Sequence, residues 1–408
     1  MHILVFEPVA TGHHMALYFK LFVRAITERG WSLTLLSTQE AVDHPAFELA
    51  RARGAHLDVL TIPPIKKAAG NRSIDLFQKQ CRYFKAVKAT MPYAISKRMP
   101  DLAFVMNLGH FEKAISVFGS PFGDIPWGGL LISGKFHRHP LGVGPKSRSD
   151  VLYRYLFERM LGIKTLRAVG VIDELFLSYV QKIGLDKSSK VTYIPDVGQL
   201  RGAQTKVQAR RDLGIREDAF VVLVYGSLSR RKGVEELLRA LHQDDIPPRV
   251  ILHLAGRQDE TTRDLLERTA YQEFLTSRRI IVSDEFHNEA MEYRAFISAD
   301  VVWLGYVDGA YGSSGVLYQA CSAGLPVVAT RHGLIGWLAT KHRLGPVVEP
   351  TDPAAVSRCI RELVSTSTLA NTLKDNAIRL AEQHTDKQFM DAIIQTLILA
   401  REGKGNRC

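Results

Sequence analysis

Short strand-forming runs alternate with helical patterns along the whole of this 408-residue chain. The runs are apolar, and the segments between them place apolar residues at the spacing of an amphipathic helix, as in 15–26, which Gly30 ends as a C-terminal cap. Apolar strands joined by helices predict parallel sheets that are covered on both faces. The predicted strands are His2–Phe6, Ser32–Leu36, Leu102–Asn107, Gly129–Ser133, Ala168–Ile172, Lys190–Ile194, Phe220–Tyr225, Arg249–Leu254, Arg279–Val282, Val301–Gly305, Pro326–Ala329 and Gly345–Val348.

The alternation restarts near residue 220, which predicts two α/β domains rather than one. A chain of this length is sufficient for two domains that each bury a core. Turn residues and a short charged helix over Gln208–Leu213 suit a connection between them. We therefore expect two doubly wound Rossmann-like domains, 1–197 and 215–385, with a linker at 198–214 and a C-terminal helix and tail at 386–408.

Composition excludes several classes of protein. Apolar residues make up 46% and charged residues 23%, the mixture of a soluble globular chain rather than a disordered one. The four cysteines are widely spaced without a C-x-x-C motif, which argues against a disulfide framework or a zinc site. The N-terminal apolar run is too short for a signal peptide, and no run of 18 apolar residues occurs. We therefore expect a cytoplasmic protein without a membrane span.

The first of two strand–helix junctions in the second half carries a group of cations. Gly226 and Ser227 follow a predicted strand, and Arg230, Arg231 and Lys232 stand just before a helix. Cations at a helix start oppose the helix dipole, at a few tenths of a kcal/mol each, and a bound anion would remove that conflict. The junction is therefore either an anion site or a solvated basic turn.

The second junction opens a short helix with small residues. Ser313 and Ser314 precede it, and the backbone N–H groups of Ser314, Gly315 and Val316 lack partners at the positive end of the helix dipole, an arrangement that suits a phosphate group. Ordinary N-capping by serine is the alternative. Two such junctions in one domain together predict a diphosphate site.

The stretch 220–350 resembles the nucleotide-sugar-binding half of the family 4 glycosyltransferases, which have the GT-B fold. The run 226–233, G-S-L-S-R-R-K-G, is similar to the family's G-R-L-x-x-x-K-G turn, and Gly315–Thr330 resembles its helix and G-x-P-V-V-A-T ending. The resemblance implies that Lys232 binds the donor diphosphate, and Ser227 replaces the family's arginine.

One departure from the family pattern concerns two glutamates that stand eight positions apart. They fall here on Tyr311 and Gln319. Gln319 can still bind ribose hydroxyls as donor and acceptor, whereas Tyr311 cannot imitate a carboxylate. The residues of the family's diphosphate site are therefore matched better in this chain than the residues of its sugar site.

The first half offers further site residues. Gly12 and His13 open a helix after the first strand, where this fold places a loop that faces the donor, and the alternative is a polar helix start. His110 matches the family's histidine near the donor sugar, and the alternative is a capping residue. His137 and His139 have the spacing of metal ligands, but no cysteine or carboxylate cluster accompanies them, so we expect no metal site. We expect these two side chains to line the acceptor side of the cleft or to face solvent.

These residues lead to an expected activity. The chain has no D-x-D motif, so we expect metal-independent catalysis in which Lys232, Arg231 and the helix start at Ser314 neutralise the departing diphosphate, with His110 as a further catalytic residue. The absence of a Walker loop and of G-x-G-x-x-G after a strand disfavours ATPases and nicotinamide enzymes.

The resemblance implies a retaining glycosyltransferase of glycan or exopolysaccharide biosynthesis. Such an enzyme needs no cofactor and moves a sugar from a nucleotide diphosphate sugar to a saccharide, glycolipid or other hydroxyl acceptor. The alternatives are a nucleotide-sugar epimerase on the same fold and a non-catalytic nucleotide-sugar-binding or scaffold protein.

The positive charge is concentrated in the first half of the chain. Residues 1–200 carry a net charge of +10 and residues 201–408 a net charge of +1. Nine cations and one anion lie within 66–98, interleaved with aromatic residues. This segment either lies peripherally on an anionic membrane surface or forms a solvated helix whose apolar side faces the core, and no motif supports nucleic-acid binding. The charge therefore points to a phosphorylated, acidic or membrane-held acceptor.

Overall fold

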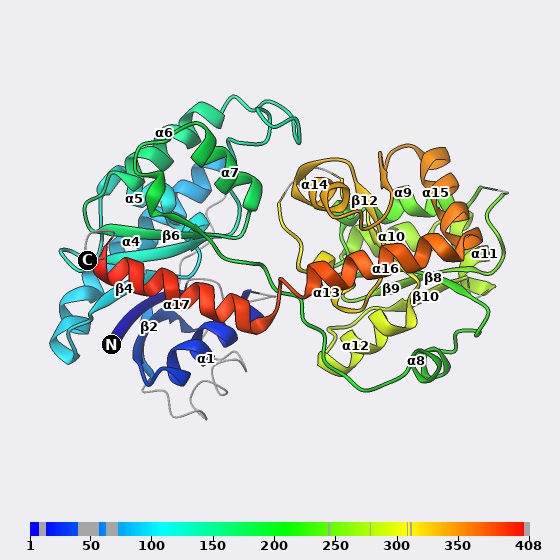
Figure 1. Cartoon of the computed structure of the whole chain (residues 1–408), viewed down its shortest axis with the longest axis horizontal. Helices are drawn as coiled ribbons and strands as arrows, with labels where there is room; N and C mark the ends of the chain where they lie inside the picture. The colour runs from blue at the N-terminus through cyan, green and yellow to red at the C-terminus, as the bar shows by residue number, and fades with distance from the viewer. Residues whose placement is uncertain are drawn as a thin grey trace. The chain divides into compact units, whose positions relative to one another are not determined.

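The structure is a computed structural model that describes residues 1–7, 14–39, 57–62, 72–243, 245–277, 279–307, 309–310 and 312–403. The chain divides into two compact units, each with its own parallel sheet (Figure 1). Unit 1 comprises Met1–Leu141, Pro145–Pro195 and Asp386–Cys408, and unit 2 comprises Gly142–Gly144 and Asp196–Thr385. The predicted fold class, two doubly wound α/β sheets, is confirmed.

The sheet of unit 1 has seven strands in the order β3-β2-β1-β4-β5-β6-β7, and neighbouring strands run parallel. The strands are β1 (His2–Glu7), β2 (Ser32–Thr38), β3 (Leu57–Ile62), β4 (Leu102–Val105), β5 (Trp127–Leu131), β6 (Leu166–Val171) and β7 (Val191–Tyr193). The helical elements are η1 (His14–Phe19), α1 (Lys20–Glu28), α4 (Arg72–Lys97), η2 (Leu108–His110), α5 (Glu112–Phe118), α6 (Asp150–Leu161), α7 (Glu174–Lys182), η3 (Ser188–Lys190) and α17 (Asp386–Glu402).

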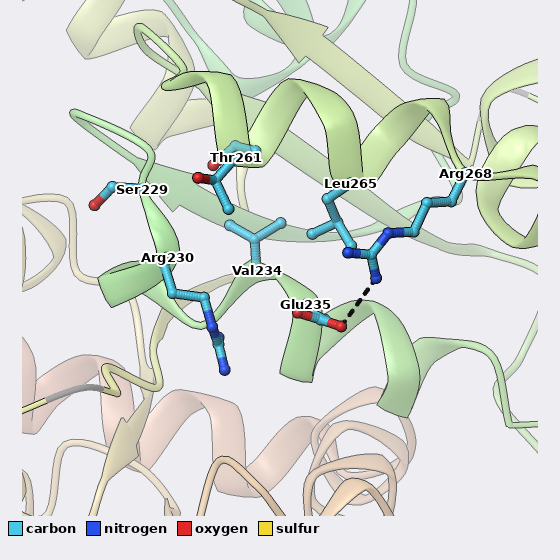
Figure 2. A pocket seen from close by; sticks show the side chains of 8 residues that line it. Ser229, Arg230, Val234, Glu235, Thr261, Leu265 and Arg268 are labelled. Carbon is cyan, nitrogen blue, oxygen red and sulfur yellow. Dashed lines mark hydrogen bonds and ion pairs between the residues drawn. The ribbon is translucent and has the colours of Figure 1, made fainter.

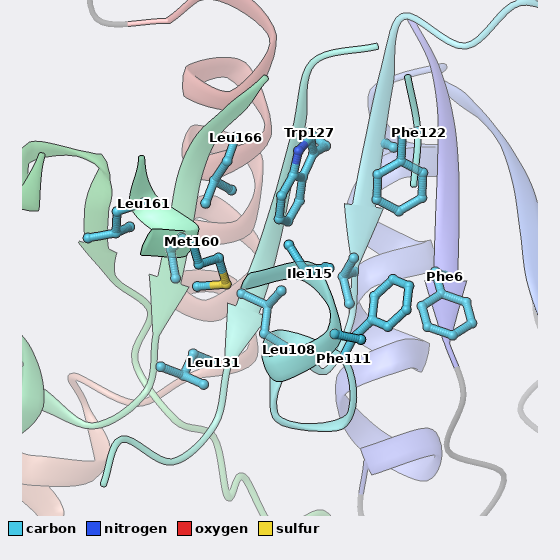
Figure 3. Packing of buried hydrophobic residues seen from close by; sticks show 14 of the residues in the cluster. Phe6, Leu108, Phe111, Ile115, Phe122, Trp127, Leu131, Met160, Leu161 and Leu166 are labelled. Atoms are coloured by element: carbon cyan, nitrogen blue, oxygen red, sulfur yellow. The ribbon is translucent and has the colours of Figure 1, made fainter. Parts of the chain in front are cut away.

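The core of unit 1 lies between the sheet and the helices α4 to α7. Aromatic side chains dominate it, and Figure 3 shows Phe6 of β1 beside Phe111 and Trp127 of β5 beside Phe122. The ring centroids of Phe6 and Phe111 lie 4.8 Å apart, and those of Phe122 and Trp127 lie 5.8 Å apart. These four side chains are almost fully buried, which is why the strands read as continuous apolar runs in the sequence.

The C-terminal helix α17 packs on the sheet of unit 1, although it follows unit 2 in the sequence (Figure 1). It contacts α1 and the strands β4, β5 and β6 through its apolar side. Phe389, Ile393 and Leu397 on that side are fully buried, and the ring of Phe389 stacks on Tyr18 at 5.4 Å. The burial of this apolar stripe explains why residues 386–403 belong to unit 1 and do not form a separate part.

The sheet of unit 2 has six parallel strands in the order β10-β9-β8-β11-β12-β13. The strands are β8 (Phe220–Tyr225), β9 (Val250–Ala255), β10 (Ile280–Ser283), β11 (Val301–Leu304), β12 (Val327–Thr330) and β13 (Val347–Val348). The helical elements are α8 (Lys206–Asp212), η4 (Arg230–Lys232), α9 (Val234–Leu241), α10 (Glu260–Glu267), α11 (Thr269–Thr276), α12 (Glu289–Ser298), α13 (Gly315–Ser322), α14 (Gly333–Lys341), α15 (Pro353–Ser365) and α16 (Ser367–Ala381).

All twelve predicted strands are present, with ends that differ by a few residues. The thirteenth strand, β3, was not predicted because polar Asp58 and Thr61 interrupt its apolar run, and among the described residues it pairs only with β2 at the edge of the sheet. Residues 198–214 were expected as a linker but lie in unit 2, since α8 packs against α12.

No helix among the residues that the structure describes is both long enough and apolar enough to cross a membrane. The longest helix, α4, is amphipathic along its described part and carries exposed cations such as Lys85 and Lys88.

Candidate functional site

The candidate site lies in unit 2 where the strand order reverses. Strands β8 and β11 are neighbours in the sheet, but the connections from them lead to opposite edges. Ligands of open α/β sheets bind outside the carboxyl ends of strands at such a reversal. The residues that follow β8 (226–233) and β11 (305–314) therefore occupy the place where a ligand is expected.

The turn after β8 owes its shape to two glycines with positive φ. Gly226 has a φ of +100° directly after the strand, and Gly233 has a φ of +66° between η4 and α9. A Cβ atom at Gly233 would lie 2.1 Å from the carbonyl oxygen of Gly305, so a residue with a side chain cannot occupy this position without displacement. The absence of a side chain thus lets the turn approach the end of β11.

Lys232, the predicted diphosphate lysine, points its side chain inward and not into solvent. It is 4% exposed, and its Nζ donates a hydrogen bond to the hydroxyl of Tyr306 at 2.7 Å. The backbone carbonyl of Lys232 accepts a hydrogen bond from Trp303 Nε1 at 2.9 Å. Side chains of β11 and its following loop therefore hold both the backbone and the ammonium group of Lys232.

Tyr306 was missed by the sequence analysis and is central to the site. Its hydroxyl lies 2.9 Å from Ser314 Oγ, so one phenol links Lys232 to the start of α13. Burial raises the pKa of Tyr306, but the Lys232 ammonium and the hydrogen bonds from Lys232 and Ser314 lower it more, and the net pKa lies below its usual value. Its position just after a buried strand at the sheet reversal is the signal that could have identified it.

The three consecutive cations of η4 have three different surroundings. Arg230 forms two contacts of 2.6 Å with the carboxylate of Glu236, whose side chain is 3% exposed, in the first turn of α9. Arg231 is exposed and lies over the ring of Tyr306, 5.3 Å from its centroid. The carboxylate of Glu236 therefore compensates the unfavourable interaction of Arg230 with the helix dipole, whereas Arg231 and Lys232 both lie near the ring of Tyr306.

The start of α13 presents backbone N–H groups beside this turn. Among the described residues none accepts a hydrogen bond from the backbone nitrogens of Gly315 and Val316. A Cβ atom at Gly226 would lie 3.6 Å from Lys232 Nζ and 4.0 Å from a methyl group of Val316, so the two loops face each other across Gly226. This arrangement has the ammonium and the N–H donors that a diphosphate requires.

Ser313 is engaged within the protein. Its hydroxyl donates a short hydrogen bond to Asp196 at the beginning of unit 2, and the ring of His384, which contacts the carbonyl of Asp196 at 2.7 Å, stacks on Tyr318. Ser313 therefore ties the loop before α13 to the segment that leaves unit 1.

Gln319, predicted to bind ribose, is 5% exposed in α13 and contacts a carboxylate. Its Nε2 donates a hydrogen bond to Glu292 Oε1 of α12 at 2.5 Å, and the hydroxyl of Tyr225 donates to the same oxygen at 3.0 Å. Burial raises the pKa of Glu292 and outweighs these two hydrogen bonds, which lower it. Glu292 was not identified from the sequence, because 27 residues separate it from Gln319 and only the fold brings the two together.

The remaining predicted site residues have different surroundings. Ser227 is exposed in the loop after β8, and His110 is half-buried in η2 of unit 1. Gly12 and His13 fall outside the described residues, as does Tyr311. His137, expected to line the acceptor side or to face solvent, is instead buried, with Nε2 3.2 Å from Asp173 Oδ2.

A pocket is lined in part by residues of the turn after β8 (Figure 2). Ser229 and Arg230 line it from the turn, and Thr261, Leu265 and Arg268 line it from α10 and the residue that follows this helix. Figure 2 shows that Arg268 is paired with Glu235, at 3.1 Å. Both arginines of the pocket are thus neutralised by carboxylates, and Lys232 does not line it. This pocket is therefore less suited to an anion than the turn at Lys232 and the start of α13.

Known protein sequences match a large part of unit 2. Residues 206–380 match the sequence profile of the family described as Glycosyl transferases group 1. An uncharacterized glycosyltransferase of Methanocaldococcus jannaschii is 30% identical over 162 residues, which cover 40% of each chain. D-inositol 3-phosphate glycosyltransferase 1 of Catenulispora acidiphila is 30% identical over 212 residues, which cover 49% of each chain. The alignments thus span less than half the length of these curated relatives.

Solved structures match the chain over almost its whole length. Anabaena HepE, in complex with UDP and glucose, has a TM-score of 0.67 at 18% identity, covering 98% of this chain and 99% of HepE. Sucrose-phosphate synthase of Thermosynechococcus elongatus has a TM-score of 0.72 at 17% identity, covering 98% of both chains. At these identities the likeness concerns the fold. The match to the group 1 glycosyl transferases covers residues 206–380, which are less than half of the chain, and the two units have the GT-B fold.

Proposed function

We propose that unit 2 binds a nucleoside diphosphate sugar and that the protein transfers the sugar to a hydroxyl acceptor. The observation that carries this proposal is the buried Lys232 ammonium, which Tyr306 and Ser314 hold beside the start of α13. A buried cation next to unpaired N–H groups is suited to a diphosphate, which carries two or more negative charges. The family that residues 206–380 match supports the sugar as the transferred group.

In the proposed reaction the bond between the anomeric carbon and the diphosphate oxygen breaks, and a bond to the acceptor oxygen forms. The acceptor hydroxyl loses its proton, and the diphosphate leaves with the bonding electron pair. Lys232, Arg231 and the N–H groups of α13 stabilise the charge that develops on this leaving group. Donors that are already in place before the reaction lower the barrier because they need no reorganisation. We propose that this protein-based stabilisation replaces a metal ion and that the anomeric configuration is retained, as the family resemblance implies.

The base and sugar of the donor follow only by analogy with related proteins. HepE was crystallised with UDP-glucose, which makes this compound the first donor to test. The resemblance to D-inositol 3-phosphate glycosyltransferases extends over 49% of the chain and favours phosphorylated acceptors as a class worth testing.

The acceptor is proposed to be anionic or held at an anionic membrane surface. Two aromatic residues of the basic segment, Tyr83 and Phe84, are buried in the core of unit 1. The cations of α4 from Lys79 to Lys97 are exposed, and Tyr93 and Met99 are exposed near its end. An exposed basic surface with a few apolar side chains attracts phosphate groups of either a substrate or a lipid.

A thermal-shift screen tests the donor proposal directly. UDP, GDP and ADP, and their glucose conjugates, should be compared at concentrations up to the millimolar range. A ligand at about 100 times its Kd raises the free energy of unfolding by about 2.7 kcal/mol, which gives a rise in Tm of several degrees. No shift with any of these compounds would contradict the proposal. Conversion of the bound sugar without an acceptor would favour an epimerase instead.

A further inference from the structure

Two lysines of unit 1 place their ammonium groups next to the same tyrosine ring. Lys113 Nζ lies 4.9 Å and Lys135 Nζ 4.5 Å from the ring centroid of Tyr153. Lys113 Nζ also donates a hydrogen bond to the Tyr153 hydroxyl, at 3.3 Å. Two positive charges beside one ring repel each other, so the cluster is suited to an anion that contacts both of them.

This cluster lies at the carboxyl ends of neighbouring strands. Lys113 is in the first turn of α5, which follows β4, and Lys135 lies in the loop after β5. Tyr153 is near the start of α6, the next helix along the chain. The strand order of unit 1 reverses between β1 and β4, so β4 borders the place where open α/β sheets bind ligands. His110, at the end of η2, belongs to the same edge of the sheet.

One carboxylate accompanies the two lysines. Glu112 Oε1 lies 3.8 Å from Lys135 Nζ, which is beyond the length of a hydrogen bond. Burial raises the pKa of Glu112 more than the charges of Lys135 and Lys113 lower it. Asp150, in the first turn of α6, accepts a hydrogen bond from the backbone nitrogen of Ser147 instead, at 3.1 Å. The two ammonium groups are therefore only partly compensated by the carboxylates that the structure describes near them.

Buried contacts hold the backbone at each lysine. Gln80 of α4 is fully buried, and its Oε1 accepts a hydrogen bond from the backbone nitrogen of Lys113 at 2.8 Å. A Cβ atom at Gly134 would lie 2.1 Å from the ring of Phe176, so the residue before Lys135 is packed closely on that ring. A cluster that is ordered in this way before a ligand arrives loses less entropy on binding.

We propose that Lys113, Lys135 and the hydroxyl of Tyr153 bind the phosphate group of a phosphomonoester acceptor. A phosphomonoester carries about 1.5 to 2 negative charges at pH 7 and has three terminal oxygens. The two ammonium groups and the phenol supply three donors, whereas a carboxylate or a phosphodiester offers two such oxygens and one charge. This inference rests on the proposed function in that it takes the phosphomonoester to be the acceptor. None of the three residues belongs to unit 2.

The test compares phosphorylated compounds with matched compounds and requires no nucleotide sugar. Calorimetry on the full chain gives the Kd values of D-myo-inositol 3-phosphate and glucose 6-phosphate, and of inositol and glucose. Vesicles with phosphatidic acid, compared with vesicles with phosphatidylglycerol, test a lipid headgroup as the source of the same phosphate group. We expect the wild type to bind at least one phosphomonoester at least about tenfold more tightly than its matched compound. A preference in one arm alone supports the site and identifies the soluble or the lipid source.

Variants of the three residues locate this preference. Lys113→Gln and Lys135→Gln should each weaken phosphomonoester binding about tenfold, because each removes a charged hydrogen-bond donor. Tyr153→Phe keeps the ring beside both lysines and removes only the hydroxyl, so we expect a smaller loss of about threefold. The unphosphorylated compounds should bind the variants and the wild type equally. Melting temperatures of the variants report whether each of them folds.

A matched double replacement controls for net charge. Lys164 and Lys182 are exposed lysines of unit 1 that lie before β6 and at the end of α7, toward the amino ends of the strands. Lys164→Gln combined with Lys182→Gln should keep the preference. Equal losses here and in Lys113→Gln combined with Lys135→Gln would overturn the site.

A wild type without preference for any phosphomonoester would also overturn the site. UDP is titrated into the same proteins and should bind all of them alike, because its proposed site lies in unit 2. Binding of UDP without a phosphomonoester preference would leave the proposed donor site intact. A phosphomonoester preference without binding of UDP would contradict the proposed donor site and support the anion site of unit 1.

Discussion

The ammonium group of Lys232 lies 2.7 Å from the phenolic oxygen of Tyr306, and this contact connects the turn after β8 with the loop after β11. Tyr306 also contacts Ser314 at the start of α13, so three segments from different parts of unit 2 meet at one phenol. A lysine held in this way is positioned before a ligand arrives. Such preorganisation is what a site needs in order to stabilise the charge of a leaving diphosphate.

Removal of the Lys232 ammonium should abolish most of the activity. We expect Lys232→Ala to lower kcat at least about 100-fold, because one preorganised charged donor contributes about 3 kcal/mol to the stabilisation of the transition state. Sugar transfer is measured at saturating donor, and circular dichroism reports folding. Lys387→Ala, an exposed lysine of unit 1, serves as the control and should retain full activity. Full turnover by Lys232→Ala would rule out its assigned role.

The Tyr306 hydroxyl should affect activity because it orients the ammonium group of Lys232. We expect Tyr306→Phe to lower kcat/KM about tenfold or more, since the ammonium loses the partner that orients it. The pH–rate profile should also change, because the pKa of Tyr306 lies below its usual value next to Lys232 and the phenol is absent in the variant. Tyr271→Phe is a matched control at a buried tyrosine of α11. Equal effects of the two replacements would indicate a structural role only.

Gly233 should tolerate no side chain, for a reason beyond its backbone angle. Gly233 and Gly214 have φ values of +66° and +65°, but a Cβ at Gly214 meets no atom within 4 Å. We expect Gly214→Ala to cost about 1 kcal/mol of the free energy of unfolding, and Gly233→Ala to cost clearly more because its Cβ meets the carbonyl of Gly305. Urea denaturation measures both. Equal losses would mean that the turn does not depend on this close approach.

The stability of unit 2 should fall in mild acid because of His253. Burial, with a smaller contribution from His287, lowers the pKa of His253 to about 4 in the folded protein, from 6.5 in the unfolded chain. Between these values the unfolded state binds more protons, so the free energy of unfolding decreases as the pH falls from 6.5 to 4, by about 3 kcal/mol in total. Urea denaturation across this range should show a smaller decrease for His253→Gln. An identical pH dependence in the two proteins would contradict the prediction.

The exposed cations of α4 should control binding to anionic acceptor surfaces. Replacing Lys79, Arg82, Lys85 and Lys88 with alanine should weaken binding to phosphatidylglycerol vesicles in low salt about tenfold or more, because each cation near such a surface contributes about 1 kcal/mol. Cosedimentation measures binding, and high salt should reduce it for the wild type. Four exposed cations of unit 2 provide the control: Arg211, Lys341, Arg358 and Lys374. No binding by the wild type at any salt concentration would exclude a membrane-held acceptor.

The class of fold follows from the sequence, and the sequence also predicts the two loops that we propose bind the donor. Apolar strands with helices between them predict parallel sheets, because a strand that is buried on both faces forms a continuous apolar run in the sequence. The run from Gly226 to Lys232 and the small residues before α13 were likewise identified, because glycines, cations and helix starts act through their immediate neighbours in the chain. For the same reason β3 was missed, since its pattern is interrupted.

The contacts between the side chains of the candidate site depend on the tertiary structure. Tyr306 lies 74 residues from Lys232, and Glu292 lies 27 residues from Gln319. Neither pairing follows from spacing, because each depends on how β8, β11, α12 and α13 are placed around the reversal of strand order. The docking of α17 on unit 1 is also a tertiary result. The apolar side of an amphipathic helix is buried in the folded protein, but the sequence of the helix does not identify the surface on which it packs.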